Sequence, residues 1–405
     1  MRFSRMERRR RFGFESLECR RPLAGNVTAS VSPFDGTLSL TGDGYANAVD
    51  VRGTGVVGEV LITPLVDVAT GQQTNVTFNG NTSSSPVLLQ GVAGLASSLQ
   101  SGNDELYVKD FAFSGNGRIW GGQGADTVRL GALVSYGQTG TGDVSFGGSL
   151  RIDEQGDVSV YDNDYVFLGR VRVNEFLEIN GYYGDDTTKF YNVTVLGQNI
   201  GLLDALKFNG GDGNDLYDVA YTTAWGGTGI WTDGVVLGGH DLVSVITSAF
   251  HGRTYIDVWH GTNTVAMNAN HFYGTIDLYS ETGNDTVILT NSLCDYRVNL
   301  TSFFWASNGN DTFRVEGNYI FERIYLNAGS GSDSVTIRAN QIATASILCG
   351  TGYDVAFVRY NYFTGAGPAD FSGGTALYPE TDVLYHYGNS YGYGFYEFES
   401  IQYVP

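Results

Sequence analysis

The sequence contains few of the residues that hold several common protein classes together. It has three cysteines and seven prolines in 405 residues, whereas 13% of its residues are aromatic. This composition excludes a disulfide scaffold, a collagen and a low-complexity disordered chain. No stretch contains the roughly 18 uncharged apolar residues of a membrane-spanning helix. We therefore expect a folded protein without a disulfide framework and without a membrane span.

Basic residues are also scarce beyond the N-terminus. Eight of the 23 Lys and Arg lie in the first 21 residues, so the remaining chain carries 15 basic and 40 acidic side chains. Such a negative body repels nucleic acid and anionic lipid and attracts cations. We therefore expect no nucleic-acid partner.

The sequence repeats with a period of 22 residues. Acidic or amide side chains recur as anchors of the repeat, and five of the ten spacings between them equal 22. These anchors are Asp104, Asp126, Asp164, Asp186, Asp215, Asp241, Asn263, Asp285, Asp311, Asp333 and Asp354. A period of this length is typical of solenoids, in which neighbouring units share one core.

Each anchor lies between two segments with alternating apolar residues. After Asp285, for example, Val287 and Leu289 alternate with other residues, and residues 276–278 alternate before it. Alternation indicates a strand with one buried face. A second polar position follows seven residues after an anchor: Thr222, Ser248, Asn270, Ser292, Asn318, Asn340 and Asn361. Three strands and three turns per repeat predict an all-β fold, a right-handed parallel β-helix with coils of about 22 residues.

We divide the chain into four parts. Residues 1–24 form a targeting or leader segment, 25–100 an N-terminal β cap, 101–364 the parallel β-helix and 365–405 an aromatic C-terminal cap. The caps are expected because both regions depart from the anchor register. They would cover open sheet edges that otherwise pair with another chain.

The N-terminal segment has a basic start but lacks the run of roughly 7 to 15 apolar residues of a secretory signal. It reads either as a disordered basic arm or as a leader. Residues 14–24, FESLECRRPLA, resemble the short leader motif that opens many extracellular proteins of planctomycetes. Together with the GNDTV coils, the chain resembles the extracellular repeat proteins of that group. This resemblance implies an extracellular or cell-surface location.

Several anchor turns also resemble the calcium-binding repeats of RTX (hemolysin-type) proteins. The sequences GDGND at 211–215 and GND at 309–311 carry this resemblance, although they occur once per coil and not in tandem nonapeptides. Such proteins bind Ca²⁺ between adjacent turns, so the resemblance implies a Ca²⁺ cofactor. The implied metal ligands are Asp215, Asp285, Asp311, Asp333 and Asp354.

An alternative for these aspartates is a turn-capping ladder without metal. Asp and Asn both accept hydrogen bonds from backbone amides in turns, and Asn263 fills one anchor without a charge. Two carboxylates about 4.8 Å apart repel by about 3.5 kcal/mol at an effective dielectric constant of about 20. A partly buried column therefore needs cations or protons, and both interpretations stay open.

No set of catalytic residues converges in the repeat. We therefore expect a non-enzymatic extracellular or cell-surface protein with a structural, adhesive or matrix-contact role, stabilised by Ca²⁺. Its expected partners are extracellular polysaccharide or other surface proteins. The alternative is a carbohydrate-active enzyme or carbohydrate-binding β-helix, resembling polysaccharide lyases or glycosidases of this fold. Its candidate sugar platforms are Trp225, Trp231, Trp259 and Trp305.

Overall fold

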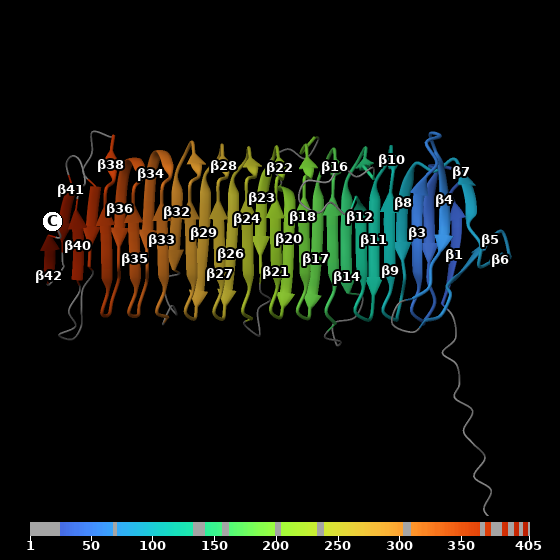
Figure 1. Ribbon diagram of the computed structural model, residues 1–405, viewed down its shortest axis with the longest axis horizontal. Helices are drawn as coiled ribbons and strands as arrows, with labels where there is room; N and C mark the ends of the chain where they lie inside the picture. Colours follow the sequence, from blue (N-terminus) through green and yellow to red (C-terminus); the bar gives the residue numbers. More distant parts are fainter. Residues whose placement is uncertain are drawn as a thin grey trace, which may run out of the picture.

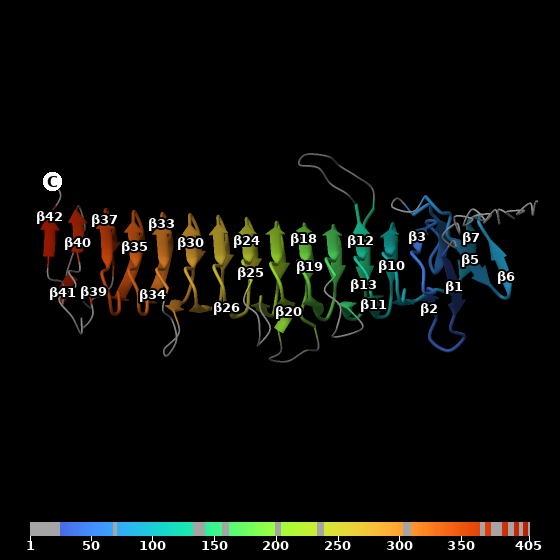
Figure 2. The ribbon, with the colours of Figure 1, turned by 90° about the horizontal axis from the view of Figure 1, so that it is seen from below.

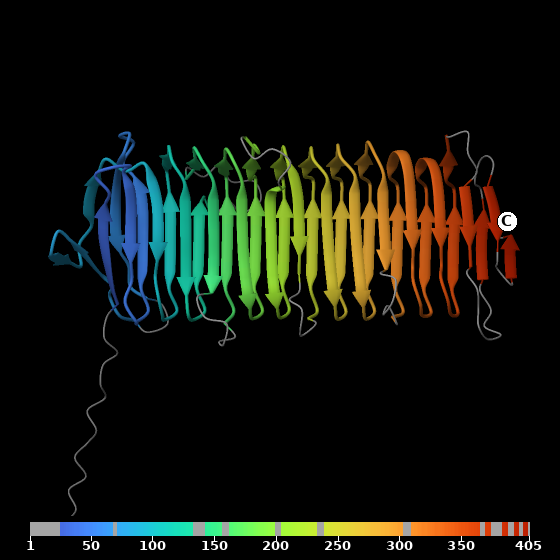
Figure 3. The same cartoon turned by 180° about the vertical axis from the view of Figure 1, so that it is seen from behind.

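The chain winds into one long stack of coils (Figures 1 and 3). This computed structural model describes residues 25–67, 71–132, 142–155, 162–198, 204–232, 239–302, 309–364, 369–373, 383–387, 393–396 and 400–403. The described residues form strands and turns but no helix. The prediction of an all-β parallel solenoid is confirmed. Residues 1–24, for which the sequence predicts a leader, and Trp305 lie outside the described residues.

No helix in the described part of the chain is long and apolar enough to span a membrane.

The strand that follows each anchor belongs to a 16-stranded sheet along one side of the stack (Figure 2). Its parallel members are β3 (Ala48–Gly53), β9 (Glu105–Lys109), β12 (Thr127–Gly131), β15 (Tyr165–Gly169), β18 (Thr187–Tyr191), β21 (Leu216–Ala220), β24 (Leu242–Ile246), β27 (Thr264–Asn268), β30 (Thr286–Thr290), β33 (Thr312–Glu316), β35 (Ser334–Arg338), β37 (Val355–Arg359), β40 (Val383–Tyr387) and β42 (Ser400–Tyr403). Each hydrogen-bonds to the equivalent strand of the next coil.

The other two strands of each coil form two rows of a 26-stranded sheet. The short row contains β10 (Phe111–Phe113), β13 (Val144–Phe146), β16 (Val171–Val173), β19 (Thr194–Val195), β22 (Thr223–Ala224), β25 (Ala249–Phe250), β28 (His271–Phe272), β31 (Leu293–Cys294) and β38 (Tyr362–Phe363). The long row contains β8 (Gly94–Ser98), β11 (Gly117–Gly122), β14 (Leu150–Gln155), β17 (Leu177–Tyr183), β20 (Asp204–Asp212), β23 (Gly227–Trp231), β26 (Thr254–His260), β29 (Ile276–Thr282), β32 (Val298–Ser302), β39 (Ala369–Ser372) and β41 (Tyr393–Tyr396). In β34 (Tyr319–Asn327) and β36 (Gln341–Leu348) the two rows run together as one strand.

The register of the sheets follows the sequence period. Val265 lies opposite Val287 in the parallel pair of β27 and β30, and Ile276 lies opposite Val298 in the pair of β29 and β32. Consecutive 22-residue repeats therefore lie directly on one another, as predicted.

Apolar side chains fill the inside of every coil. Val265, Val287 and Phe313 are all buried and stack along the axis, and the rings of Phe250 and Phe272 stack with their centroids 5.5 Å apart. Burying one such side chain contributes roughly 1.5–3 kcal/mol. Since a single coil cannot close this core, its stability depends on its neighbours.

The N-terminal region combines hairpins with the first coil. Its strands are β1 (Asn26–Val31), β2 (Thr37–Thr41), β3 (Ala48–Gly53), β4 (Glu59–Pro64), β5 (Asn75–Phe78), β6 (Asn81–Ser83) and β7 (Val87–Gln90). Antiparallel pairs join β1 to β2, β3 to β4, β4 to β7 and β5 to β6. Yet β2 and β3 pair in parallel with β8 and β9. The parallel ladders thus begin within 25–100, the range predicted as a cap.

The parallel ladders also continue past residue 364. Strand β40 pairs with β37, and β42 pairs with β40. In the other sheet β39 pairs with β36, and β41 pairs with β39. The paired positions are 28 residues apart for Val355 and Val383 and 17 apart for Val383 and Ser400, so the pairing continues although the sequence no longer keeps the period of 22. The aromatic C-terminal cap stays a prediction. The side chains of the aromatic run at 385–398 and Asp382 lie outside the described residues.

One turn of the coil depends on glycine. Gly283 precedes its anchor by two residues and has a φ of 120°, a conformation that side chains with a Cβ rarely adopt. A Cβ at Gly283 would also overlap the carbonyl oxygen of Gly261 in the preceding coil. Close stacking of these turns thus explains the glycine before the anchor.

Candidate functional site

The anchor side chains form a continuous buried column, which we call the acidic ladder. It consists of Asn47, Asp104, Asp126, Asp164, Asp186, Asp215, Asp241, Asn263, Asp285, Asp311, Asp333 and Asp354, all 0–4% exposed. In each step, the Oδ1 atom of one anchor accepts the backbone N–H of the anchor in the preceding coil. The N···O distances run from 2.6 to 3.0 Å. The ladder therefore hydrogen-bonds one coil to the next.

All five predicted calcium ligands belong to this ladder. Asp311 donates its N–H to Asp333 at 2.7 Å, and Asp333 donates its N–H to Asp354 at 2.8 Å. One oxygen of each accepting carboxylate is thus engaged by a backbone amide, which is the turn-capping role. Ca²⁺ binding at Asp215, Asp285, Asp311, Asp333 and Asp354 stays a prediction.

Burial makes the ladder a poor place for negative charge. It raises the pKa of Asp104 to about 8, that of Asp333 to about 8 and that of Asp285 to about 7. The hydrogen bond from the backbone amide acts in the opposite direction, because it stabilises the charged form, but desolvation outweighs it. The ladder therefore takes up protons near neutral pH unless cations compensate its charge.

A neutral counterpart, the amide ladder, follows the second turn. It consists of Thr222, Ser248, Asn270, Ser292, Asn318, Asn340 and Asn361, which are also buried. Each side-chain oxygen accepts the backbone N–H of the preceding member at 2.8–3.2 Å. Asn340 also donates from Nδ2 to the carbonyl oxygen of Val315 at 2.7 Å. This ladder also hydrogen-bonds one coil to the next, but its acceptors are uncharged.

A glutamate reaches the acidic ladder from the opposite sheet. In β14, Asp153 lies opposite Trp120 of β11 and Asn180 of β17. The next residue, Glu154, therefore lies between Gly121 and Gly181. It points inward and is 2% exposed. The site has an acid where the neighbouring coils have glycine.

Glu154 completes a cluster with Asp164 and Asp186, which we call the interior acid triad. One carboxylate oxygen from each residue lies within 4.8 Å of those of the other two. Burial raises the pKa of Glu154 well above its usual range, and the charges of Asp164 and Asp186 add to this effect. Burial likewise raises the pKa of Asp164 to about 9 and that of Asp186 to about 7. The triad cannot carry three negative charges without protons or a cation.

Aromatic side chains line the outer face of the long strand row. Trp231, Tyr255 and Tyr279 come from three successive coils and form what we call the aromatic row. Their ring centroids lie 5.6 and 5.4 Å apart. The guanidinium of Arg253 lies 5.3 Å from the Tyr255 ring, and the Tyr255 hydroxyl donates to Asp257 at 2.7 Å. The row thus combines flat apolar faces with charged and hydrogen-bonding groups.

A second aromatic set lies at the corner after the short strands. The rings of Trp225 and His251 stack 3.9 Å apart, and those of His251 and Tyr273 stack 4.2 Å apart. Trp225 is 56% exposed. We call these three residues the corner stack.

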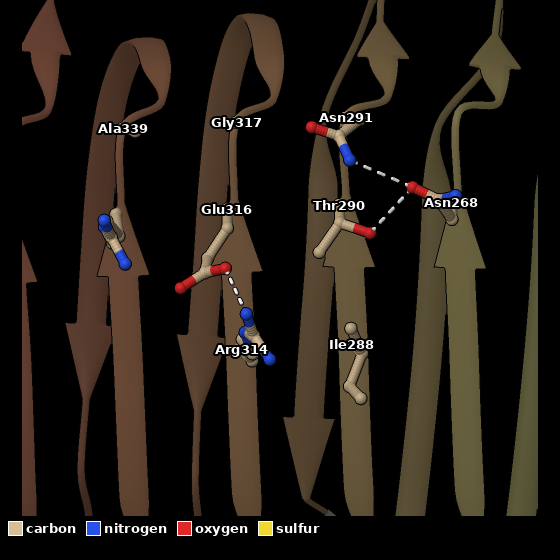
Figure 4. A pocket seen from close by; sticks show the side chains of 9 residues that line it. Asn268, Ile288, Thr290, Asn291, Arg314, Glu316, Gly317 and Ala339 are labelled. Atoms are coloured by element: carbon tan, nitrogen blue, oxygen red, sulfur yellow. Dashed lines mark hydrogen bonds and ion pairs between the residues drawn. The ribbon is translucent and has the colours of Figure 1, made fainter.

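A shallow hollow on the 16-stranded sheet is lined by two arginines (Figure 4). Arg314 and Arg338 line it, and Arg314 forms an ion pair with Glu316 at 2.6 Å. Arg359 lies over the ring of Phe357. The ion pair of Arg314 is therefore formed within its own strand and not with the acidic ladder.

The sequence identified the ladder members from Asp104 to Asp354 but missed Asn47 and Glu154. Ten residues separate Glu154 from Asp164, whereas five separate Gly121 from Asp126 and Gly181 from its anchor. One feature of the sequence could have revealed Glu154. In LRIDEQ at 150–155, side chains alternate from the inward Leu150, and this alternation places residue 154 on the inward face of the strand.

The chain matches no family model, no curated protein and no solved structure in the three comparisons. No relative therefore assigns it a function, and the β-solenoid fold and its described side chains supply the remaining observations.

Proposed function

We propose that the protein is a non-enzymatic extracellular or cell-surface β-solenoid with an adhesive or matrix-contact role, which binds polysaccharide along the aromatic row. The observation that carries this proposal is the contact between the rings of Trp231, Tyr255 and Tyr279 across three successive coils. Trp231 and Tyr279 lie in one column, on either side of Asp257, and Tyr255 lies two residues to the side. The C–H faces of sugar rings pack on aromatic rings, which present a negative π face and lose little entropy on binding. A repeat of such rings along a rigid axis suits a polymer with repeated units.

The charges around the row favour a neutral polysaccharide. Lys207 lies 5.5 Å from the Trp231 ring but is 3.3 Å from Glu178, and Arg253 is paired with Asp277. Both cations are thus balanced locally, and the whole chain carries a formal charge of −20. A polyanion would meet overall repulsion.

We include Ca²⁺ at the acidic ladder in this proposal. An oxygen-rich buried column with raised pKa values is a suitable place for a hard cation. Bound Ca²⁺ would offset the repulsion between coils and stiffen the rod. If Ca²⁺ does so, chelation with EDTA lowers the thermal unfolding midpoint; an unchanged midpoint contradicts this part.

A second candidate, a carbohydrate-active enzyme, has one observation in its favour. Burial raises the pKa of Asp257, which lies beside the aromatic row. Glycosidases use an acid of raised pKa as proton donor, but they need a second carboxyl group across the substrate. Asp257 accepts a hydrogen bond from Tyr255, and its charge adds to the effect of burial that raises the pKa of Glu281, the carboxyl group that would have to fill this second role.

Polysaccharide binding is tested by affinity electrophoresis through gels that contain neutral glucan, xylan, mannan or, as a polyanion, polygalacturonate. We expect retardation by at least one neutral polymer and roughly tenfold weaker binding for Trp231→Ala or Tyr279→Ala, which is the loss of about 1.4 kcal/mol. Trp225→Ala in the corner stack is the matched control and should bind like the wild type. Unretarded wild type, or an equal loss in Trp225→Ala, would overturn the assignment.

The same polymers distinguish the two candidates. The proposed binder releases no reducing ends on prolonged incubation. Release of oligosaccharides that Asp257→Asn abolishes would establish the enzyme instead. Antibody labelling of intact cells tests the proposed cell-surface location. A signal that appears only after lysis of the cells would contradict this location.

A further inference from the structure

Glu154 has a carboxyl group inside the solenoid that no turn requires. Glu154 projects from the middle of a coil, at a position that glycine occupies in both adjacent coils. Both of its carboxylate oxygens are buried and have no hydrogen-bond partner among the described residues. An ionised carboxylate in such a place costs several kcal/mol unless another group compensates it.

We propose that Glu154, Asp164 and Asp186 bind one divalent metal cation, Ca²⁺ in preference to others, inside the solenoid between the two sheets. This site differs from the predicted calcium sites at Asp215, Asp285, Asp311, Asp333 and Asp354, none of which belongs to the triad. It also does not depend on polysaccharide binding.

The free oxygens of the triad converge. Asp164 and Asp186 use Oδ1 to accept backbone N–H groups of the ladder, whereas their Oδ2 atoms are buried without a partner. Together with the two oxygens of Glu154, they leave four buried oxygens to bind a cation. Two ligands at about 2.4 Å from Ca²⁺ are at most about 4.8 Å apart, and the triad atoms lie within 4.8 Å of one another.

The glycines next to Glu154 leave room for this convergence. A Cβ at Gly181 would clash with Asp186 Oδ2, and a Cβ at Gly121 would lie 2.5 Å from Asp126 Oδ2 and 2.8 Å from the carbonyl oxygen of Glu154. The space beside Gly181 is therefore occupied by a proposed ligand oxygen, and the space beside Gly121 by the ladder carboxylate of Asp126 and the backbone of Glu154. A larger residue at position 181 would displace Asp186 from the site.

The apolar core also becomes polar near the triad. The second residue after the anchor is Thr188 in one coil and Tyr217 in the next coil. In the coils before and after these two, the same position is occupied by Val166 and Val243. Tyr217 is 3% exposed, and carboxylates that include Glu154 contribute to its raised pKa. Its phenol oxygen thus belongs to the same polar interior.

The ligand chemistry selects the ion. The triad offers only carboxylate oxygens, with no nitrogen or sulfur, so hard cations such as Ca²⁺, Mg²⁺ and Mn²⁺ suit it better than Zn²⁺ or Cu²⁺. Glu154 lies in β14, and the two aspartates lie in the turns before β15 and β18. Carboxylates that converge from such different elements suit the variable coordination of Ca²⁺ better than the strict octahedron of Mg²⁺. A divalent ion would offset two of the three charges.

Metal content after purification in Ca²⁺ and exhaustive dialysis tests the site. We expect Glu154→Gln to contain one Ca²⁺ fewer per chain than the wild type. Glu178→Gln, the same change at an outward position of the adjacent strand β17, is the matched control and should retain all its metal. Calcium at the acidic ladder would contribute equally to all three proteins, so the difference isolates the triad.

Terbium luminescence gives a second readout in protein with an intact triad. Tb³⁺ replaces Ca²⁺ at oxygen sites and emits when a nearby tyrosine transfers energy to it. We expect luminescence on Tb³⁺ addition that Ca²⁺ competes away and that Tyr217→Phe reduces at least twofold. This experiment decides the question if Glu154→Gln lacks the β-sheet circular dichroism of the wild type.

Equal metal content in the wild type and Glu154→Gln overturns the proposal, and so does an equal loss in Glu178→Gln. Tb³⁺ luminescence that Tyr217→Phe leaves unchanged also contradicts it. In that case shared protons, and not a metal, compensate the triad. Loss of polysaccharide binding with intact metal content would contradict only the proposed function.

Discussion

The acidic ladder and the amide ladder make the same hydrogen bond with different charge. In both, a buried side-chain oxygen accepts a backbone N–H from the preceding coil at comparable distances. In the amide ladder, Asn340 also donates to a backbone carbonyl and to Asn361. In the acidic ladder, Asp104 has a second buried oxygen without a partner. Amides therefore satisfy the turn more completely than carboxylates do.

This comparison separates what the fold needs from what it tolerates. Asn263 occupies one step of the acidic ladder and makes the same bond, with its Oδ1 3.0 Å from the backbone nitrogen of Asp241. The turn geometry thus needs an acceptor but not a charge. The remaining carboxylates add a desolvation cost, and this excess charge is available to protons or cations.

The largest expected effect is a dependence on pH that only the acidic ladder produces. The pKa of Asp104 and of Asp333 is raised to about 8 in the folded state, whereas an unfolded Asp titrates near 3.9. The folded chain therefore binds more protons between these values, and its stability falls as pH rises through about 8. Thermal unfolding in EDTA at constant ionic strength should give a lower midpoint at pH 9 than at pH 5.

Calcium sharpens this prediction. At pH 9 ladder members such as Asp104, Asp285 and Asp333 are ionised, so Ca²⁺ should raise the midpoint most there, and Glu154→Gln should retain this response if the ladder binds Ca²⁺. A midpoint that rises from pH 5 to pH 9 in EDTA would show that hydrogen bonding to the ionised form outweighs burial.

The next largest effect should follow from breaking the amide ladder. Asn340→Ala removes the acceptor for the Asn318 N–H and the donor to the Val315 carbonyl. Two buried backbone groups lose their partners, at a cost of roughly 2–4 kcal/mol in the free energy of unfolding. Urea unfolding measures this loss. The exposed Asn268→Ala is the control and should change stability by less than about 0.5 kcal/mol.

A smaller loss is expected in the acidic ladder. Asp333→Ala removes only the acceptor for the Asp311 N–H, which costs roughly 1–3 kcal/mol. The change also removes a buried carboxylate, and this gain partly offsets the loss at high pH. Urea unfolding at pH 5 should therefore show a larger deficit than unfolding at pH 9. A greater loss than in Asn340→Ala would reverse the order of the two ladders.

The sequence predicts the coils wherever insertions are absent. Alternation at Val287 and Leu289 and the spacing of 22 residues were sufficient to place strands that lie on one another. The ladder member Asn47 was not predictable, because residues of three hairpins separate it from Asp104. A sequence period cannot be recognised where the insertion in a coil is longer than the coil itself.

The chemistry was less predictable than the fold. A sequence pattern identifies the column of aspartates, but the choice between metal ligand and amide acceptor depends on which oxygen meets which backbone nitrogen. Glu154 was missed because its contact with Asp164 and Asp186 joins opposite sheets. Such a contact has no sequence period, since among the described coils a cluster of three such acids occurs at this position alone.

The smallest expected effect decides whether the charge of the ladder matters to the fold. Asp333→Asn keeps the Oδ1 acceptor for Asp311, as Asn263 does for Asp241, so at pH 5 it should lie within about 0.5 kcal/mol of the wild type. At pH 9 the variant should be more stable, because burial and the neighbouring Asp354 penalise the ionised wild-type side chain. Urea unfolding in EDTA at both pH values measures the difference. Calcium reverses the sign if Asp333 is a ligand, since the amide then binds the ion less tightly than the carboxylate; a variant that stays more stable in Ca²⁺ contradicts a calcium site at Asp333.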